Sequence, residues 1–125
     1  MIDSSIAQEY LRTGRCADGD VIDLHAHYGH FSGIYMPNHS PAHMIATMDR
    51  CGVETIVSAG HTALADMVQG NAEIAEISQR YPGRWYGYLT YNPNYPEEGR
   101  RELELYEARP TFVGLKFHPS SHEIE

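Results

Sequence analysis

The chain has 125 residues, with 9 Lys and Arg against 17 Asp and Glu, which gives a formal net charge of −8 at pH 7. This length suffices for one domain with a buried core, and we expect a single domain over residues 1–125. The acidic balance, without a basic stripe, argues against nucleic acid or an anionic membrane as a partner. Cys16 and Cys51 support neither a disulfide framework nor a zinc finger, and no stretch is typical of a signal peptide or a membrane span. These features predict a soluble, cytoplasmic protein.

Apolar periodicity and turn residues predict strands that alternate with helices. Residues 1–20 form an N-terminal extension that contains a short helix over about 4–13. Further helices are expected from Pro41 to just before Gly52, over 71–81, and from about Pro96. No helix is expected in the polar tail after Pro119. The predicted strands cover residues 21–27, 54–60, 85–91 and 112–118.

The strands recur about every 30 residues with a helical segment between them, which is the rhythm of βαβ units. A parallel α/β sheet follows, either an open doubly wound sheet or part of a (β/α)₈ barrel. We favour the barrel, because polar side chains alternate along the first and fourth strands, whereas strands of an open sheet are apolar on both faces. No glycine-rich dinucleotide fingerprint follows the first strand.

The first strand places ionisable side chains on one face. Successive strand residues alternate sides, so Asp23, His25 and His27 are expected to share one face, with Ile22, Leu24 and Ala26 on the other. Histidines two residues apart can bring ring nitrogens to one metal ion, and Asp23 could orient them. A pair of histidines on a solvated strand is the alternative interpretation of this H-x-H pattern.

The fourth strand repeats this arrangement. Gly114, Lys116 and His118 are expected on one face, with Leu115 and Phe117 on the other. Other side chains at the same rim are candidates too: His30 and His61 as further ligands, and Tyr28, Tyr88 and Asn92 as pocket residues. Three histidines are expected to be exposed, namely His39, His43 and His122.

Four stretches together resemble a known family. The H-x-H at 25–27, with the stretches 51–57, 81–87 and 114–119, is similar to the amidohydrolase superfamily and to its amidohydrolase-2 branch. The resemblance covers about residues 20–120. It implies a metal-dependent enzyme on a (β/α)₈ barrel, of which the four strands over 21–119 are the first half. H-x-H alone is less specific, because phosphoesterases of the polymerase and histidinol phosphatase type also carry it.

The resemblance also implies roles for particular residues. His25 and His27 match the metal ligands on the first strand, Lys116 matches a lysine that is carboxylated in some members or faces substrate, and His118 matches a position near the site. The ligands on later strands of the family have no counterpart in this sequence. We therefore expect the N-terminal half of a longer barrel, with a homo-oligomer that closes a barrel from two copies as the alternative.

The function expected from the resemblance is that of a metal-dependent hydrolase. Zinc is the expected ion by ligand type, and water activated by it would attack an amide, ester or lactone. Lys116 and His118 would contact a small-molecule substrate, which their charge suggests is acidic. Two other functions are alternatives: a decarboxylase or hydratase on the same scaffold, and a non-catalytic half-barrel that binds metal weakly or packs on a partner.

Overall fold

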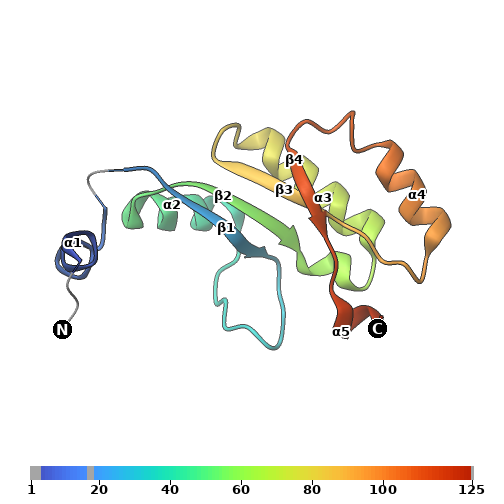
Figure 1. The fold of residues 1–125 in the computed structure, drawn as a ribbon, viewed down its shortest axis with the longest axis horizontal. Coiled ribbons are helices and arrows are strands. Elements are labelled where there is room, and N and C mark those ends of the chain that lie inside the picture. The colour runs from blue at the N-terminus through green and yellow to red at the C-terminus, as the bar shows by residue number, and fades with distance from the viewer. Residues whose placement is uncertain (1–3, 17–18, 125) are drawn as a thin grey trace.

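Four parallel strands form the centre of the computed structural model, which describes residues 4–16 and 19–124. They lie in the order β1-β2-β3-β4, so that each strand pairs with its neighbour in the sequence (Figure 1). Their bounds are Val21–Tyr28, Val53–Gly60, Trp85–Thr90 and Phe112–Lys116. The α/β class and the parallel sheet predicted from the sequence are therefore confirmed. The four strands of the described residues form an open sheet and not a closed barrel.

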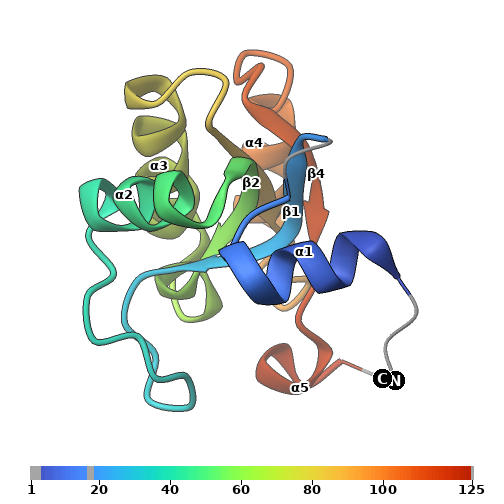
Figure 2. The same ribbon diagram turned by 90° about the vertical axis from the view of Figure 1, so that its left-hand side faces the viewer.

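Helices connect the strands and cover one face of the sheet (Figure 2). The connecting segments, in order, are α2 (Pro41–Cys51), the 3₁₀ helix η1 (His61–Leu64) with α3 (Met67–Arg80), and α4 (Pro96–Glu104). The core lies between α3 and the two central strands, where Trp85 and Leu89 of β3 are fully buried against Ile74 and Ile77 of α3. None of the helices in the described part of the chain is long and apolar enough to cross a bilayer.

Two helical features differ from the sequence prediction. The helix expected over 71–81 begins earlier, because the side chain of Asp66 accepts a hydrogen bond from the backbone N of Gln69 at 2.9 Å and caps α3 at Met67. A short helix α5 (Pro119–His122) lies in the tail where we expected none. The ring of His118 caps this helix by accepting a hydrogen bond from the backbone N of Ser121. Side-chain capping of this kind has a weak signature in sequence.

The N-terminal helix α1 (Ser5–Thr13) lies beside the rest of the fold and has no buried residue (Figure 1). Ser4 caps its start and Gly14, at φ 71°, ends it, as the sequence predicted. The following Arg15 holds this segment to α2, because its guanidinium donates to the backbone oxygens of Asp49 and Arg50 at 2.6 and 3.1 Å. These polar contacts attach the segment that follows α1, while the helix leaves its own apolar side chains exposed.

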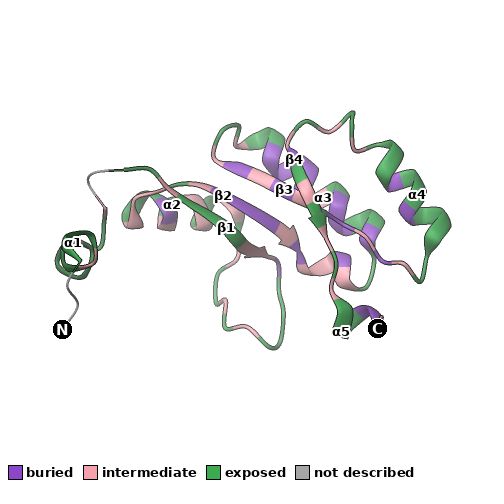
Figure 3. Ribbon diagram, in the orientation of Figure 1, coloured by how far each residue is buried: buried purple, intermediate pink, exposed green. Residues whose placement is uncertain are grey.

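The two outer strands are much more exposed than the two central ones (Figure 3). Leu24 of β1 is 62% exposed, while Leu115 of β4 and Phe117 just after it are 45% and 46% exposed. Leu115 pairs with the buried Leu89, so it lies on the side of the sheet that carries the helices. Within the described ranges β1 and β4 each have one strand neighbour. The sheet therefore presents two open edges with apolar side chains at each.

Candidate functional site

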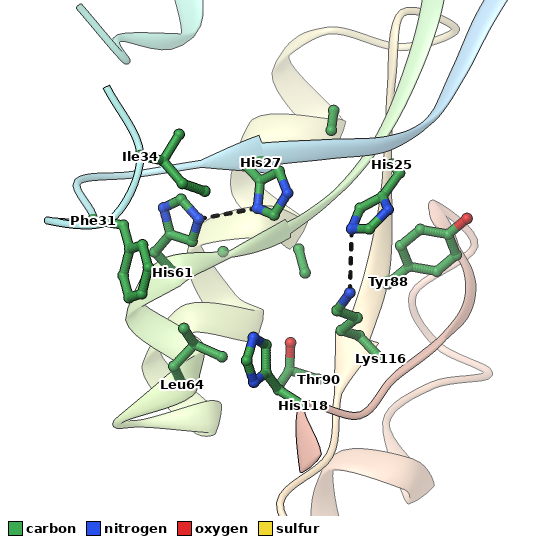
Figure 4. Close-up of a pocket in the computed structure, with 13 residues that line it drawn as sticks. His25, His27, Phe31, Ile34, His61, Leu64, Tyr88, Thr90, Lys116 and His118 are labelled. Atoms are coloured by element: carbon green, nitrogen blue, oxygen red, sulfur yellow. Dashed lines mark hydrogen bonds between the residues drawn. The ribbon is translucent and has the colours of Figure 1, made fainter. Parts of the chain in front are cut away.

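A small pocket opens at the carboxyl ends of the strands, on the face opposite the helices (Figure 4). Its volume is about 70 Å³, well below the several hundred Å³ typical of a complete small-molecule site. Parallel sheets place their sites at this end of the strands. Every strand contributes to its lining, which consists of His25, Ala26, His27, Phe31, Ile34, Ala59, Gly60, His61, Leu64, Tyr88, Thr90, Lys116 and His118.

The two histidines of the H-x-H lie together in this pocket, as predicted. Their ring centroids are 5.1 Å apart and the rings are stacked at an interplanar angle of 30°. His25 is exposed, whereas His27 is half-buried. Burial lowers the pKa of His27 below its ordinary value, and the nearby His61, His25 and Lys116 lower it further. The shift favours the neutral form, in which an imidazole can bind a metal ion.

The prediction that Asp23 shares this face is wrong. The register of β1 against β2 shifts between Asp23 and Ala26, so the strict alternation of sides is interrupted. Asp23 pairs with the buried Ile56 and lines a separate groove beside α2. Its carboxylate accepts a hydrogen bond from the backbone N of His25 at 2.9 Å. Asp23 thus fixes the backbone of the irregular strand and does not enter the pocket.

The two residues predicted from the fourth strand also line the pocket. The Nζ of Lys116 lies 3.4 Å from Nε2 of His25, so an ammonium group from β4 reaches across to β1. His118 follows β4, and its Nδ1 accepts from the backbone N of Ser121 at 3.2 Å. Because Nδ1 is the acceptor in the neutral ring, the proton is on Nε2, which is then a hydrogen-bond donor. Lys116 and His118 therefore both supply donors to this side of the pocket, and Lys116 supplies positive charge.

Of the other rim residues considered from the sequence, His61 and Tyr88 line the pocket. His30 lies instead in a second pocket, formed by the loop over residues 30–39. Tyr28 packs in the core against Trp85, and Asn92 lies outside the pocket of His25 and His27. Thr90 was missed, although the alternation from Tyr88 could have indicated it. The large apolar side chains of the lining come from a loop and a 3₁₀ helix, whose paths have no periodic signal: Phe31, Ile34 and Leu64.

The expected exposure of three histidines holds for His43 only. His39 is partly buried, and His122 is 2% exposed with no hydrogen-bond partner for either ring nitrogen among the described residues. His122 ends α5, and the side chain of Asn94 donates to its backbone oxygen. Burial lowers the pKa of His122, and the neighbouring His118 lowers it further. The short helix α5 turns this side chain inward, which a polar tail sequence does not indicate.

This burial predicts a loss of stability in mild acid. A histidine whose pKa is lower in the folded state binds its proton more tightly in the unfolded state, so folding is favoured above about pH 6.5 and weakened as the pH falls below it. We expect the free energy of unfolding, measured with urea, to fall between about pH 7 and pH 5 in the wild type. In His122→Gln this part of the decrease should disappear. An equal dependence of the free energy of unfolding on pH in both proteins would contradict the assignment of this decrease to His122.

Among the described residues no group of three or more His, Cys, Asp or Glu side chains is placed to hold a metal ion. The imidazoles of His25 and His27 suit zinc by donor type, but the described chain brings no carboxylate into the pocket. Comparison with protein-family models gave no matching family, and searches of curated proteins and of solved structures gave no significant match.

Proposed function

We propose that the pocket is the N-terminal half of a metal-dependent hydrolase site, in which His25 and His27 bind a divalent ion, zinc by ligand type. The observation that carries this proposal is the convergence of both imidazoles with Lys116 and His118 at the carboxyl end of a parallel sheet. When bound, zinc supplies an activated water and a polarised carbonyl. Burial lowers the pKa of His27, and this shift towards the neutral ring favours the role.

The remaining pocket residues are assigned to the substrate. The ammonium of Lys116 and the Nε2–H of His118 are both donors, which suits an anionic group on a small molecule. The Nζ of Lys116 lies 3.4 Å from Nε2 of His25, which is the proposed ligand atom. If an ion takes this nitrogen, the ammonium group would turn towards the substrate. Hydrolysis also needs a base, and the described residues that line the pocket include no carboxylate. We therefore assign ion and substrate binding to these residues, and not the proton transfer.

We further propose that the sheet is the first half of a (β/α)₈ barrel of the amidohydrolase type. The support is the order β1-β2-β3-β4 with parallel pairing throughout, together with exposed apolar side chains at both edges. Strands that cover β1 and β4 would bury Leu24 and Leu115 and enlarge the pocket. They would come from a longer chain or from a second copy of this one.

Zinc titration tests the metal-binding proposal. We expect His25→Ala/His27→Ala to weaken zinc binding by more than about 100-fold, because both proposed ligands are lost. Affinity would be measured by calorimetry, with the mass of the species determined by light scattering so that ions are counted per chain. The matched control is His30→Ala/His43→Ala, which removes two exposed histidines outside the pocket. Equal affinities for the two double variants would contradict the proposal.

An activity panel then tests the reaction class. Zinc-dependent hydrolysis of anionic esters, lactones or amides by the wild type, and not by His25→Ala/His27→Ala, is the expected result. Aromatic and β-keto acids belong in the same panel, because release of carbon dioxide from them would indicate a decarboxylase instead. Tight zinc binding without turnover of any substrate would contradict catalysis while leaving the metal site in place.

A further inference from the structure

A row of three groups runs from the end of β1 into the pocket. Nε2 of His61 lies 3.0 Å from Nδ1 of His27 (Figure 4). On the other side of the ring, Nδ1 of His61 lies 2.8 Å from the backbone oxygen of Gly29. The last residues of β1 and β2, Tyr28 and Gly60, pair with each other. Gly29 directly follows β1 and His61 directly follows β2, so both lie at the same rim as His27. Both nitrogens of His61 are thus committed to contacts within the protein.

The chemistry of these groups sets the direction of the two hydrogen bonds. A carbonyl oxygen only accepts, so Nδ1 of His61 carries the proton and donates to Gly29. In the neutral ring the other nitrogen, Nε2, then holds a lone pair. Two lone pairs would repel at 3.0 Å, so Nδ1 of His27 must carry a proton and donate to His61. The free lone pair of His27 is consequently on its Nε2.

Local structure holds this row in place. Gly29 is buried and has a φ of 91°, a left-handed conformation that turns the chain directly after β1 and that other residues rarely adopt. His61 begins η1, which is held against α3 by the close approach of Gly70 to the backbone of Ala63. Phe31 packs on the His61 ring with centroids 5.0 Å apart. The ring of His61 is therefore fixed by backbone on one side and by packing on another.

We propose that His61 is a positioning residue that fixes His27 in the tautomer protonated on Nδ1 and so presents Nε2 of His27 to the metal ion; the part that concerns the ion rests on the proposed function. The residues that hold a metal commonly receive such support from a second hydrogen bond on the opposite ring nitrogen. Nε2 of His25 lies opposite the ammonium of Lys116, which only donates, so it also holds its lone pair. The same nitrogen, Nε2, thus holds the lone pair on both proposed ligands.

Nitrogen-15 NMR of histidine-labelled protein tests the tautomer without any metal. Long-range proton couplings distinguish a protonated from a free ring nitrogen, and we expect His27 to carry its proton on Nδ1 in the wild type. In His61→Phe the acceptor is lost, so the proton should move towards Nε2, the form that free histidine favours. His61→Gln can donate its amide N–H to Gly29 and accept from His27 with its amide oxygen, so it should restore the wild-type tautomer.

Zinc affinity of the same proteins tests the consequence. We expect His61→Phe to weaken binding by about 10–100-fold, and His61→Gln and the exposed control His43→Phe to leave it unchanged. A wild-type His27 protonated on Nε2, or a tautomer unaffected in His61→Phe, would overturn the inference even if zinc binds. A shift of the His61 Nε2 resonance that shows zinc bound directly to it would also overturn it. Absence of zinc binding would instead contradict the proposed function, while the metal-free spectra still decide the tautomer.

Discussion

Replacing Arg109 by alanine is expected to lower the free energy of unfolding by about 3–5 kcal/mol, because it leaves a buried carboxylate without its counter-charge. The side chain of Glu102, in α4, is 3% exposed, and its Oε2 accepts from Arg109 at 2.7 Å. The same oxygen accepts from the amide of Asn71 at 3.0 Å. Asn71 in turn bonds the backbone N and O of Thr90, at the end of β3. This network joins α3, α4 and the segment before β4 to the central sheet.

The matched control for this substitution lies in α4, the helix that carries Glu102. Arg100 pairs with Glu97 at 3.5 Å, but both side chains are more than half exposed, at 67% and 71%. Arg100→Ala should therefore cost no more than about 1 kcal/mol. Urea unfolding of both variants gives the comparison. In the background of Arg109→Ala, Glu102→Gln should recover part of the lost stability, because it removes the unpaired charge. Equal losses of stability in Arg109→Ala and Arg100→Ala would contradict a buried ion pair.

Gly70→Ala is expected to destabilise the fold by about 3 kcal/mol or more, although alanine is the better helix former by about 1 kcal/mol. A Cβ at this position in α3 would lie 2.3 Å from the backbone N and 2.5 Å from the Cα of Ala63 in η1. The Cβ of Ala63 would also lie at 2.5 Å, but because the other two obstructing atoms are backbone, relief requires η1 to move. His61 begins η1, so the support of His27 should weaken as well.

A second glycine provides the comparison. At Gly99 in α4 a Cβ would meet the ring of Tyr91 at 2.4 Å, which is a side chain that can rotate away. We therefore expect Gly99→Ala to cost less than Gly70→Ala in thermal or urea unfolding. Ala63→Gly combined with Gly70→Ala should not restore stability, since the Ala63 backbone would still obstruct the methyl group. Full recovery in that double variant would show that side-chain crowding, and not the backbone contact, is the cause.

Much of the sheet could be predicted from the sequence, because local patterns determine it. The strand starts at Val21 and Trp85, the α2 stop at Gly52 and the parallel order follow from apolar runs, turn residues and the spacing of βα units. The joint placement of His25 and His27 follows from the two-residue repeat of a strand, which survives between these two positions. The role of these residues and the closed barrel stay predictions.

The tertiary structure alone decided the rest, because it depends on register and on contacts between distant segments. A one-residue shift of β1 against β2 takes Asp23 out of the pocket, and no property of residue 23 itself indicates that shift. The contact of His61 with His27 joins residues 34 apart, and a four-residue helix buries His122. Sequence periodicity reports the side on which a residue lies within one regular element. It carries no information on which elements contact each other, and these contacts determine the polar partners of a site.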